Sequence, residues 1–142
     1  MLTRPPQSPY DLIITDAGEH EHVVIGSRVR LLEGSEIGVV SEVESHFSRV
    51  KLFSTSGEKT NAVLERSQIP VVLEGVGGGN FRISVPRDVA VVVGDRILSS
   101  ALDASLLAVV ADIKVTATDS FKEVLARSPA NIFSIRFVSI SP

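Results

Sequence analysis

Short runs of apolar residues, separated by polar turns, recur along the whole chain. Phe81, Ile83 and Val85 alternate with Arg82 and Ser84, which is the two-residue period of a strand with one buried face. Similar runs are bounded by Gly, Pro, Ser or Asp, the residues that punctuate strands. The pattern predicts strands at 10–16, 28–32, 37–43, 49–54, 60–64, 71–73, 81–85, 106–116 and 132–140, and residues 89–99 contain a Gly-Asp corner.

Residues 121–126 fit two structures. Ser120 and Glu123 have the spacing of a helix capping box, whereas Val124, Leu125 and the following Pro129 fit a strand equally well. Elsewhere the sequence has no segment with the period of a long amphipathic helix. We therefore predict an all-β fold of many short strands, arranged as barrels or a sandwich.

One sequence pattern occurs twice. Residues 91–98 (VVVGDRIL) and 23–30 (VVIGSRVR) both contain an apolar run, a Gly-polar corner, an Arg and a β-branched residue. Farther along, residues 108–113 (AVVADI) resemble residues 38–43 (GVVSEV). The copies lie 68 residues apart at the first block and 70 at the second. The pattern predicts two similar β units, with chance similarity of Val-rich strands as the alternative.

The repeat suggests how the chain divides. We expect residues 1–70 to form a first β-barrel unit with a Pro-rich lead-in strand, and residues 71–142 to form a second, with the C-terminal strand free to return to the first. Residues 74–80 would be the flexible, Gly-rich tip of a hairpin. Five residues are predicted to form structural turns: Gly18, Gly26, Gly38, Gly94 and Asp95.

Composition narrows the range of functions. The chain has 142 residues, of which 44% are hydrophobic, 22% charged and 5% aromatic, so a core is expected and must be mainly aliphatic. The absence of Cys excludes disulfides, thiolate zinc sites and a Cys nucleophile. No run approaches the roughly 20 apolar residues of a membrane helix. If the natural protein is exported or anchored, we expect that part to lie upstream of this sequence.

Nucleic-acid binding has little support in the sequence. Phe47 and Phe53 flank Arg49 and Lys51, a combination that could stack on bases. However, the net charge is −3 and no basic stripe is present. We expect the two aromatic side chains to cover a core or a hairpin, and we expect no nucleic-acid partner.

Two clusters could carry chemistry. Residues 19–22 (EHEH), with His46 as a third ligand, could offer imidazoles and carboxylates to a metal. Ser99 or Ser100, His46 and Asp95 provide the residue types of a hydrolase triad. No spaced ligand set accompanies the first cluster, and no nucleophile motif accompanies the second. A solvated acidic loop and a plain turn are the interpretations we favour, with no metal and no catalytic residue.

The Gly-rich segment 75–79 (GVGGG) invites comparison with phosphate-binding loops. It lacks the Gly-Lys-Ser/Thr of a P-loop, no helix is predicted to follow, and Asn80 stands at the third glycine of a dinucleotide motif. We therefore expect no nucleotide or other cofactor.

Four segments are informative in their order and spacing: 4–11 (RPPQSPYD), 14–18 (ITDAG), 37–43 (IGVVSEV) with 48–52 (SRVKL), and 94–100 (GDRILSS). Together they resemble the extracytoplasmic β domain of the MreC family of rod shape-determining proteins. The matching features of that family are, in the same order, a Pro-bearing first strand, ID-x-G, iGrV-x-eV with S-x-V-x-L, and GD-x-V-x-TSG. The resemblance covers residues 4–140 and departs at Ala101, where the family has Gly, and at 104–110, which shortens a Gly/Pro-rich turn.

The resemblance implies two small β-barrels, with residues 121–126 as a strand, and a non-enzymatic scaffold of lateral cell-wall elongation. It implies self-association, and partners that include a class B penicillin-binding protein, other Mre proteins and, through the membrane, the actin-like cytoskeleton. It also implies an extracytoplasmic location, anchored by an N-terminal membrane helix and a coiled coil that this sequence lacks.

Two alternatives remain open at this point. The first is an adaptor module of the membrane-fusion type in efflux or secretion, which a lipoyl-like hairpin carrying a helical pair would identify. The second is a degenerate hydrolase, which labelling of Ser99 or Ser100 by an active-site serine probe would identify.

Overall fold

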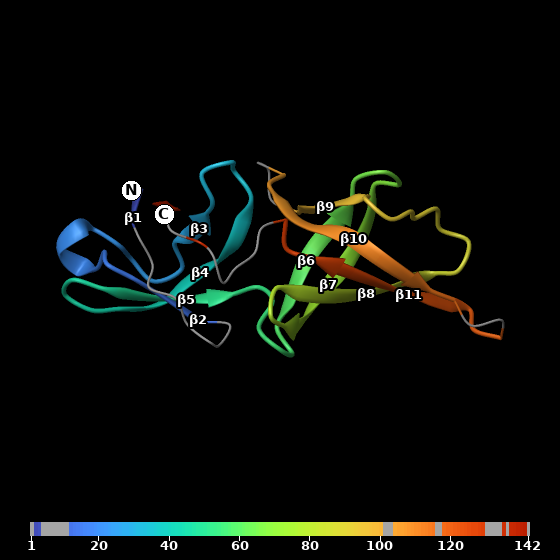
Figure 1. Ribbon diagram of the computed structural model, residues 1–142, viewed down its shortest axis with the longest axis horizontal. Coiled ribbons are helices and arrows are strands. Elements are labelled where there is room, and N and C mark those ends of the chain that lie inside the picture. Colours follow the sequence, from blue (N-terminus) through green and yellow to red (C-terminus); the bar gives the residue numbers. More distant parts are fainter. Residues whose placement is uncertain are drawn as a thin grey trace.

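The computed structural model describes residues 2–3, 12–100, 104–115, 118–129, 135 and 137–141. Two β units lie side by side along the long axis of the molecule (Figure 1). The predicted all-β fold is confirmed, because the helical content of the described residues is one 3₁₀ turn, η1 (Glu19–Glu21). The Pro-rich segment 4–9, Ala101 and residues 132–134 lie outside the described residues.

The first unit is a six-stranded sheet in the order β1-β12-β3-β4-β5-β2. All neighbouring strands in this sheet are antiparallel. The C-terminal strand β12 thus lies between β1 and β3. The bounds are β1 (Leu2–Thr3), β2 (Leu12–Thr15), β3 (Arg28–Arg30), β4 (Glu36–Val43), β5 (Ser48–Leu52) and β12 (Val138–Ser141).

The second unit is a closed barrel in the order β10-β11-β8-β7-β6-β9. The predicted boundary at residue 70 does not match this order, because β6 precedes it and pairs with β7 and β9 of the barrel. The segment 121–126 is a strand, as the resemblance implied. The bounds are β6 (Lys59–Leu64), β7 (Ile69–Gly77), β8 (Asn80–Pro86), β9 (Arg96–Ser99), β10 (Leu106–Lys114) and β11 (Phe121–Arg127).

The predicted repeat is confirmed in the pairing of the strands. β3 and β4 pair with a register shift that skips Ile37, and β9 and β10 pair with a shift that skips Leu107. A second bulge follows at Ser41 in β4 and at Ala111 in β10. Bulges bend strands in a fixed way, so β3-β4-β5 and β9-β10-β11 are equivalent ribbons. In the two strand orders, β12 then occupies the place of β6, β1 that of β7, and β2 that of β8.

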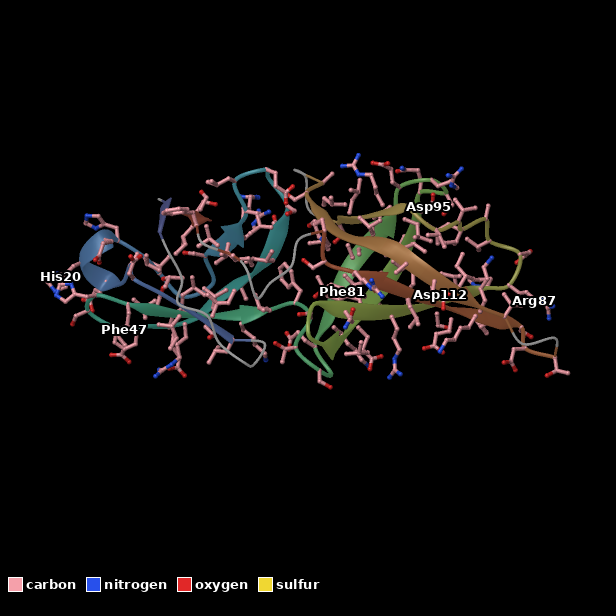
Figure 2. All side chains as sticks on the ribbon, in the orientation of Figure 1. His20, Phe47, Phe81, Arg87, Asp95 and Asp112 are labelled. Carbon is pink, nitrogen blue, oxygen red and sulfur yellow. The ribbon has the colours of Figure 1, made fainter. Side chains whose placement is uncertain are left out.

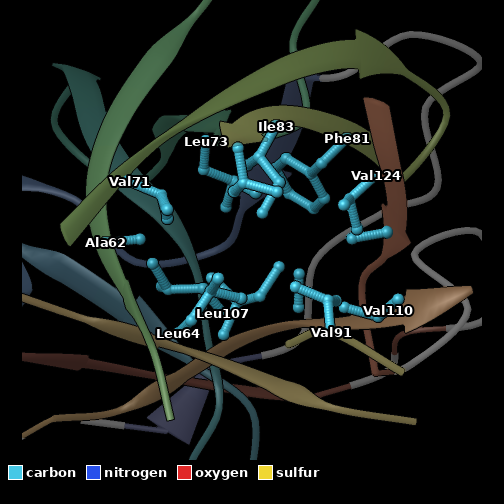
Figure 3. Packing of buried hydrophobic residues seen from close by; sticks show 14 residues of the cluster. Ala62, Leu64, Val71, Leu73, Phe81, Ile83, Val91, Leu107, Val110 and Val124 are labelled. Carbon is cyan, nitrogen blue, oxygen red and sulfur yellow. The ribbon is translucent and has the colours of Figure 1, made fainter. Parts of the chain in front are cut away.

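Each unit has its own aliphatic core. The barrel core includes Leu64, Leu73 and Ile97, which are at most 1% exposed, with Phe81 as its fully buried aromatic residue (Figure 3). A separate cluster fills the first unit, where Val29 and Val50 are completely buried. The inward side chains alternate along the strands, as the sequence pattern predicted.

The two units are joined through the Gly-rich tip of the β7–β8 hairpin. The Gly77 N–H donates to the Ser54 carbonyl oxygen at 2.7 Å, in the linker between β5 and β6. At Gly75, an added Cβ would lie 2.3 Å from the Thr55 carbonyl oxygen. The side chain of Phe53 packs against the barrel core. The tip is therefore a packed joint rather than the free hairpin end that we predicted, because only glycine lets the two backbones approach so closely.

Candidate interaction surface

The first copy of the repeated motif forms a corner at residues 23–27, called corner 1 here. Gly26 has φ +90°, and its N–H donates to the Val40 carbonyl oxygen at 2.9 Å. The Val40 N–H in turn donates to the Ser27 carbonyl oxygen at 2.9 Å. The buried Ser27 hydroxyl closes the turn by donating to the Val24 carbonyl oxygen at 2.7 Å.

The second copy forms corner 2, residues 91–95, with the same backbone bonds. Gly94 has φ +96°, its N–H donates to the Val110 carbonyl oxygen at 2.8 Å, and the Val110 N–H donates to the Asp95 carbonyl oxygen at 2.8 Å. The Asp95 carboxylate accepts a bond of 2.9 Å from the Val92 N–H and bonds of 2.8 and 2.9 Å from Arg66 Nε. Asp95 is therefore fixed in the turn by a backbone N–H and a guanidinium group.

Both corners expose a pair of β-branched side chains. In corner 1, Val24 and Ile25 are 52% and 70% exposed, and in corner 2, Val92 and Val93 are 49% and 64% exposed. The backbone bonds beneath them hold each pair in one orientation. Exposed apolar groups on a rigid support are typical of protein–protein contact surfaces. The corners are thus two exposed apolar sites, one on each unit of the described structure.

Two of the predicted turn glycines have another role. Gly38 does not form a turn: it lies inside β4, and an added Cβ there would be 2.3 Å from the Lys51 carbonyl oxygen of β5. Gly18 caps η1, and an added Cβ there would be 2.2 Å from the Glu44 carbonyl oxygen. At both positions the close approach of a second backbone requires glycine, and sequence alone does not show such an approach.

The residues of the considered hydrolase triad lie apart. Asp95 lies beside β9 of the barrel, whereas His46 lies in the turn between β4 and β5 of the first unit. Figure 2 labels Asp95 and Phe47, the residue that follows His46, in different units. The Ser100 hydroxyl donates to the Asn61 carbonyl oxygen at 3.3 Å. The structure therefore does not bring these residues together as a triad.

The acidic, His-containing segment 19–22 is fixed against the β4–β5 turn. The rings of His20 and His46 stack with centroids 4.5 Å apart, and a Glu21 carboxylate oxygen lies 3.9 Å from His46 Nδ1. Stacked rings direct their nitrogens alongside each other rather than toward a shared ligand. Within the described ranges, no group of three or more His, Asp or Glu residues is arranged to hold a metal ion.

The aromatic and basic residues that could have formed a nucleic-acid surface are directed to different parts of the structure. Arg49 lies over the Phe47 ring, 5.7 Å from its centroid, while Phe53 is directed into the barrel core. Lys51 forms an ion pair of 2.9 Å with Glu58. Phe47 and Phe53 therefore do not form a common platform.

The family model for the rod shape-determining protein MreC, barrel core, matches residues 1–142. The chain belongs to the MreC family. A curated relative, the cell shape-determining protein MreC of Caulobacter vibrioides, is 32% identical over 88 residues, 61% of this chain and 25% of the relative. The chain thus corresponds to a minor part of that longer protein.

Solved MreC structures share the fold. The crystal structure of MreC from Pseudomonas aeruginosa has a TM-score of 0.90 at 20% identity and covers 100% of this chain and 98% of that one. MreC in the complex between penicillin-binding protein PBP2 and MreC from Helicobacter pylori has a TM-score of 0.59 at 12% identity, covering 99% and 98%. In the described part of this chain, no helix has the length and apolarity to cross a membrane.

Proposed function

We propose that this MreC-family chain is a non-enzymatic interaction domain of the bacterial cell-wall elongation machinery, which helps to maintain cell shape. Two exposed apolar corners, one on each unit, carry the proposal. We place the domain outside the cytoplasm, held at the membrane by a segment upstream of the present sequence. The proposed role requires no cofactor and no nucleic acid.

The proposed partners follow the family. A class B penicillin-binding protein comes first, because one related MreC was solved in complex with PBP2. Self-association and contacts with other Mre proteins are further proposals, supported by the presence of equivalent corners on both units. The dispersed positions of Ser100, His46 and Asp95 support a function without catalysis.

The test is binding of the chain to the extracytoplasmic part of the penicillin-binding protein from the same source. Ile25→Asp and Val93→Asp together place charges on both corners, and we expect the Kd to rise at least about tenfold, as for loss of a contact hot spot. Val76→Asp is the matched control, since Val76 is also exposed, at 41%, but lies outside the corners. Equal Kd values for the corner variant and the parent would contradict the proposed surface.

Two further measurements address the other parts of the proposal. Sedimentation velocity at increasing concentration should show association that the corner variant weakens, and a strictly monomeric chain would contradict self-association. An active-site serine probe should leave Ser99 and Ser100 unlabelled, whereas labelling would support the hydrolase alternative. The membrane-fusion adaptor alternative lacks support, since the hairpins in the described ranges carry no inserted helical pair.

A further inference from the structure

The barrel has a seam at which two neighbouring strands are not paired. Continuing the register of the β7–β8 hairpin would place Val72 opposite Ser84 and Pro70 opposite Pro86, but no ladder pair joins β7 and β8 there. We call residues 69–73 and 83–86, all of them described, the seam. The pairs that close the hairpin end are Glu74↔Arg82, Gly75↔Phe81 and Gly77↔Asn80.

The hydrogen bonds of Gly75 show which backbone groups of β7 point toward β6 and which point toward β8. The Gly75 N–H donates to the Glu58 carbonyl oxygen at 2.8 Å, and the Gly75 carbonyl oxygen accepts from the Gly57 N–H at 3.0 Å, so residue 75 bonds on the β6 side. Backbone groups alternate between the two sides of a strand. The N–H and C=O of Val72 therefore point away from β6 and into the seam.

The same reasoning applies to β8. The Gly79 carbonyl oxygen accepts from the Ser128 N–H at 2.7 Å, and the Arg87 N–H donates to the Ser120 carbonyl oxygen at 2.9 Å, so the odd-numbered residues bond on the β11 side. The N–H and C=O of Ser84 therefore face β7. Val72 and Ser84 thus direct backbone donors and acceptors toward each other across the seam without a ladder pair.

Two prolines prevent the ladder from reaching the far end of the strands. Pro70 and Pro86 occupy facing positions at the far end of the seam, and neither has an N–H to donate. Proline within a sheet is typical of an edge rather than of a central strand. With both donors missing, the pairing cannot continue from the hairpin end to the end of the strands.

An open depression of about 820 Å³ lies over the seam. The buried Ala62, Val71 and Ile83 contribute to its lining, together with Val72 and Ser84 from the two sides of the seam. This volume is in the range of ligand pockets. The central part of its lining is therefore uncharged and largely apolar.

Of the four charged residues that line the depression, Lys59, Glu74 and Arg82 are near the closed end of the hairpin, and Glu123 lies beside the seam. An Arg82 nitrogen lies 3.0 Å from a Glu74 carboxylate oxygen, and this hydrogen bond holds the pKa of the Glu74 carboxyl below its usual range. Lys59 is the cross-strand neighbour of Glu74, and Glu123 is the neighbour of Ser84. The charges alternate in sign and offset one another, so the seam has no net attraction for a charged ligand.

The first unit provides an independent comparison. Its strands β1 and β2 correspond to β7 and β8, and they are the two edges of its open sheet. In the described residues no pairing joins β1 to β2. Within the described residues, the position that is unpaired in the first sheet is therefore paired in the barrel only at the hairpin end.

We propose that the seam accepts an uncharged, extended peptide segment of a partner protein as an additional strand. The Val72 and Ser84 N–H groups, together with the C=O groups of the two facing edges, are groups that an extended backbone complements on both sides. The apolar lining would take alternate side chains of that segment. This site is distinct from the corners and does not depend on the proposed scaffold function.

Amide exchange of the free ¹⁵N-labelled chain is the first test. The Val72 and Ser84 amides should exchange at least about tenfold faster than those of Leu73 and Ile83, which point to paired neighbours. Equal protection at Val72 and Leu73 would overturn the seam, because it would mean that the Val72 N–H is bonded. The comparison uses neighbouring residues of the same strand, so global stability cancels.

Peptide binding is the second test, with the acetylated and amidated heptapeptide Thr-Val-Thr-Ile-Thr-Val-Thr as the probe. We expect it to shift and protect the Val72 and Ser84 amides, and its copy N-methylated at alternate residues to bind at least about tenfold more weakly. Val72→Pro removes the N–H and should weaken binding by a similar factor, whereas Val72→Thr retains it and should not.

Three outcomes would overturn the proposal. They are absence of binding, equal binding of the N-methylated peptide, and shifts that map outside the seam. Protection of Val72 that depends on the concentration of the chain alone would assign the seam to a second copy instead of a partner peptide. The N-methylated peptide keeps the test decisive even if Val72→Pro does not fold.

Discussion

Replacing Asp95 tests whether the two corners are built in the same way. The Asp95 side chain is 5% exposed and accepts hydrogen bonds from the Val92 N–H and from Arg66. The charge-assisted bond to the backbone is worth about 1.5 kcal/mol. The ion pair contributes no more than about 1 kcal/mol, because the Arg66 side chain is 54% exposed. Asp95→Ala should therefore lower the free energy of unfolding by about 2–3 kcal/mol.

Three further variants separate these contributions. Asp95→Ser installs the residue of corner 1, whose hydroxyl bonds to the carbonyl oxygen three residues earlier, and should recover about 1 kcal/mol of the loss. Arg66→Ala alone should lower the free energy of unfolding by less than about 1 kcal/mol. Adding Arg66→Ala to Asp95→Ser should cause no further loss, because the ion pair is already absent. The combination follows a double-mutant cycle, which isolates the pairwise energy.

Urea unfolding followed by circular dichroism measures these free energies, provided that the slope is unchanged between variants. If Asp95→Ala lowers the free energy of unfolding by less than about 0.5 kcal/mol, then the hydrogen bonds of Asp95 do not stabilise corner 2 as the structure indicates. Equal costs for Arg66→Ala and Asp95→Ala would show that the ion pair alone matters. If Asp95→Ser is as unstable as Asp95→Ala, then the corners are not interchangeable.

Two other outcomes are expected. Gly75→Ala should lower the free energy of unfolding by about 1–3 kcal/mol through overpacking, since the new Cβ would meet the Thr55 carbonyl oxygen at 2.3 Å. The control Gly78→Ala should lower it by only about 1 kcal/mol, because of the positive φ at residue 78. Denaturant titrations measure both values, and equal costs would contradict the packed joint at Gly75. Arg82 lowers the pKa of the Glu74 carboxyl in the folded chain. The pair therefore stabilises the fold above the unfolded-state pKa of Glu74, and this stabilisation is lost as pH falls through the folded-state pKa. In an NMR titration, the midpoint for Glu74 should be higher in Arg82→Gln than in the parent, and an unchanged midpoint would refute the pairing.

The repeated pattern was the most informative feature of the sequence. The Val-rich run followed by Gly26 or Gly94 indicated a corner, and the pairing of the strands shows that the two corners and their bulges correspond. Local chemistry determines this feature, because a tight corner needs a positive φ and a small polar residue beside it. Such requirements can be read from a single short segment.

Other features depend on contacts between distant segments, which the pattern does not contain. Arg66 lies 29 residues from Asp95 in the sequence, and no local signal connects them. The Gly75 tip looked like a loose loop, because glycine is equally typical of free turns and of close backbone contacts. The facing of Pro70 and Pro86 could be recognised only after the register of β7 and β8 was known.

The equivalence of β6 and β12 has a consequence for how the chain folds. Counted along the sequence, each repeat has six strands, yet each sheet takes one strand from the other repeat: β6 goes to the barrel and β12 to the first sheet. The barrel strands 59–127 are contiguous and can close as soon as they are synthesised. The first sheet must wait for residues 138–141, at the cost of a long loop closure. Strand exchange therefore makes the N-terminal unit the last to be completed, and a fragment cut between β5 and β6 would leave it one strand short.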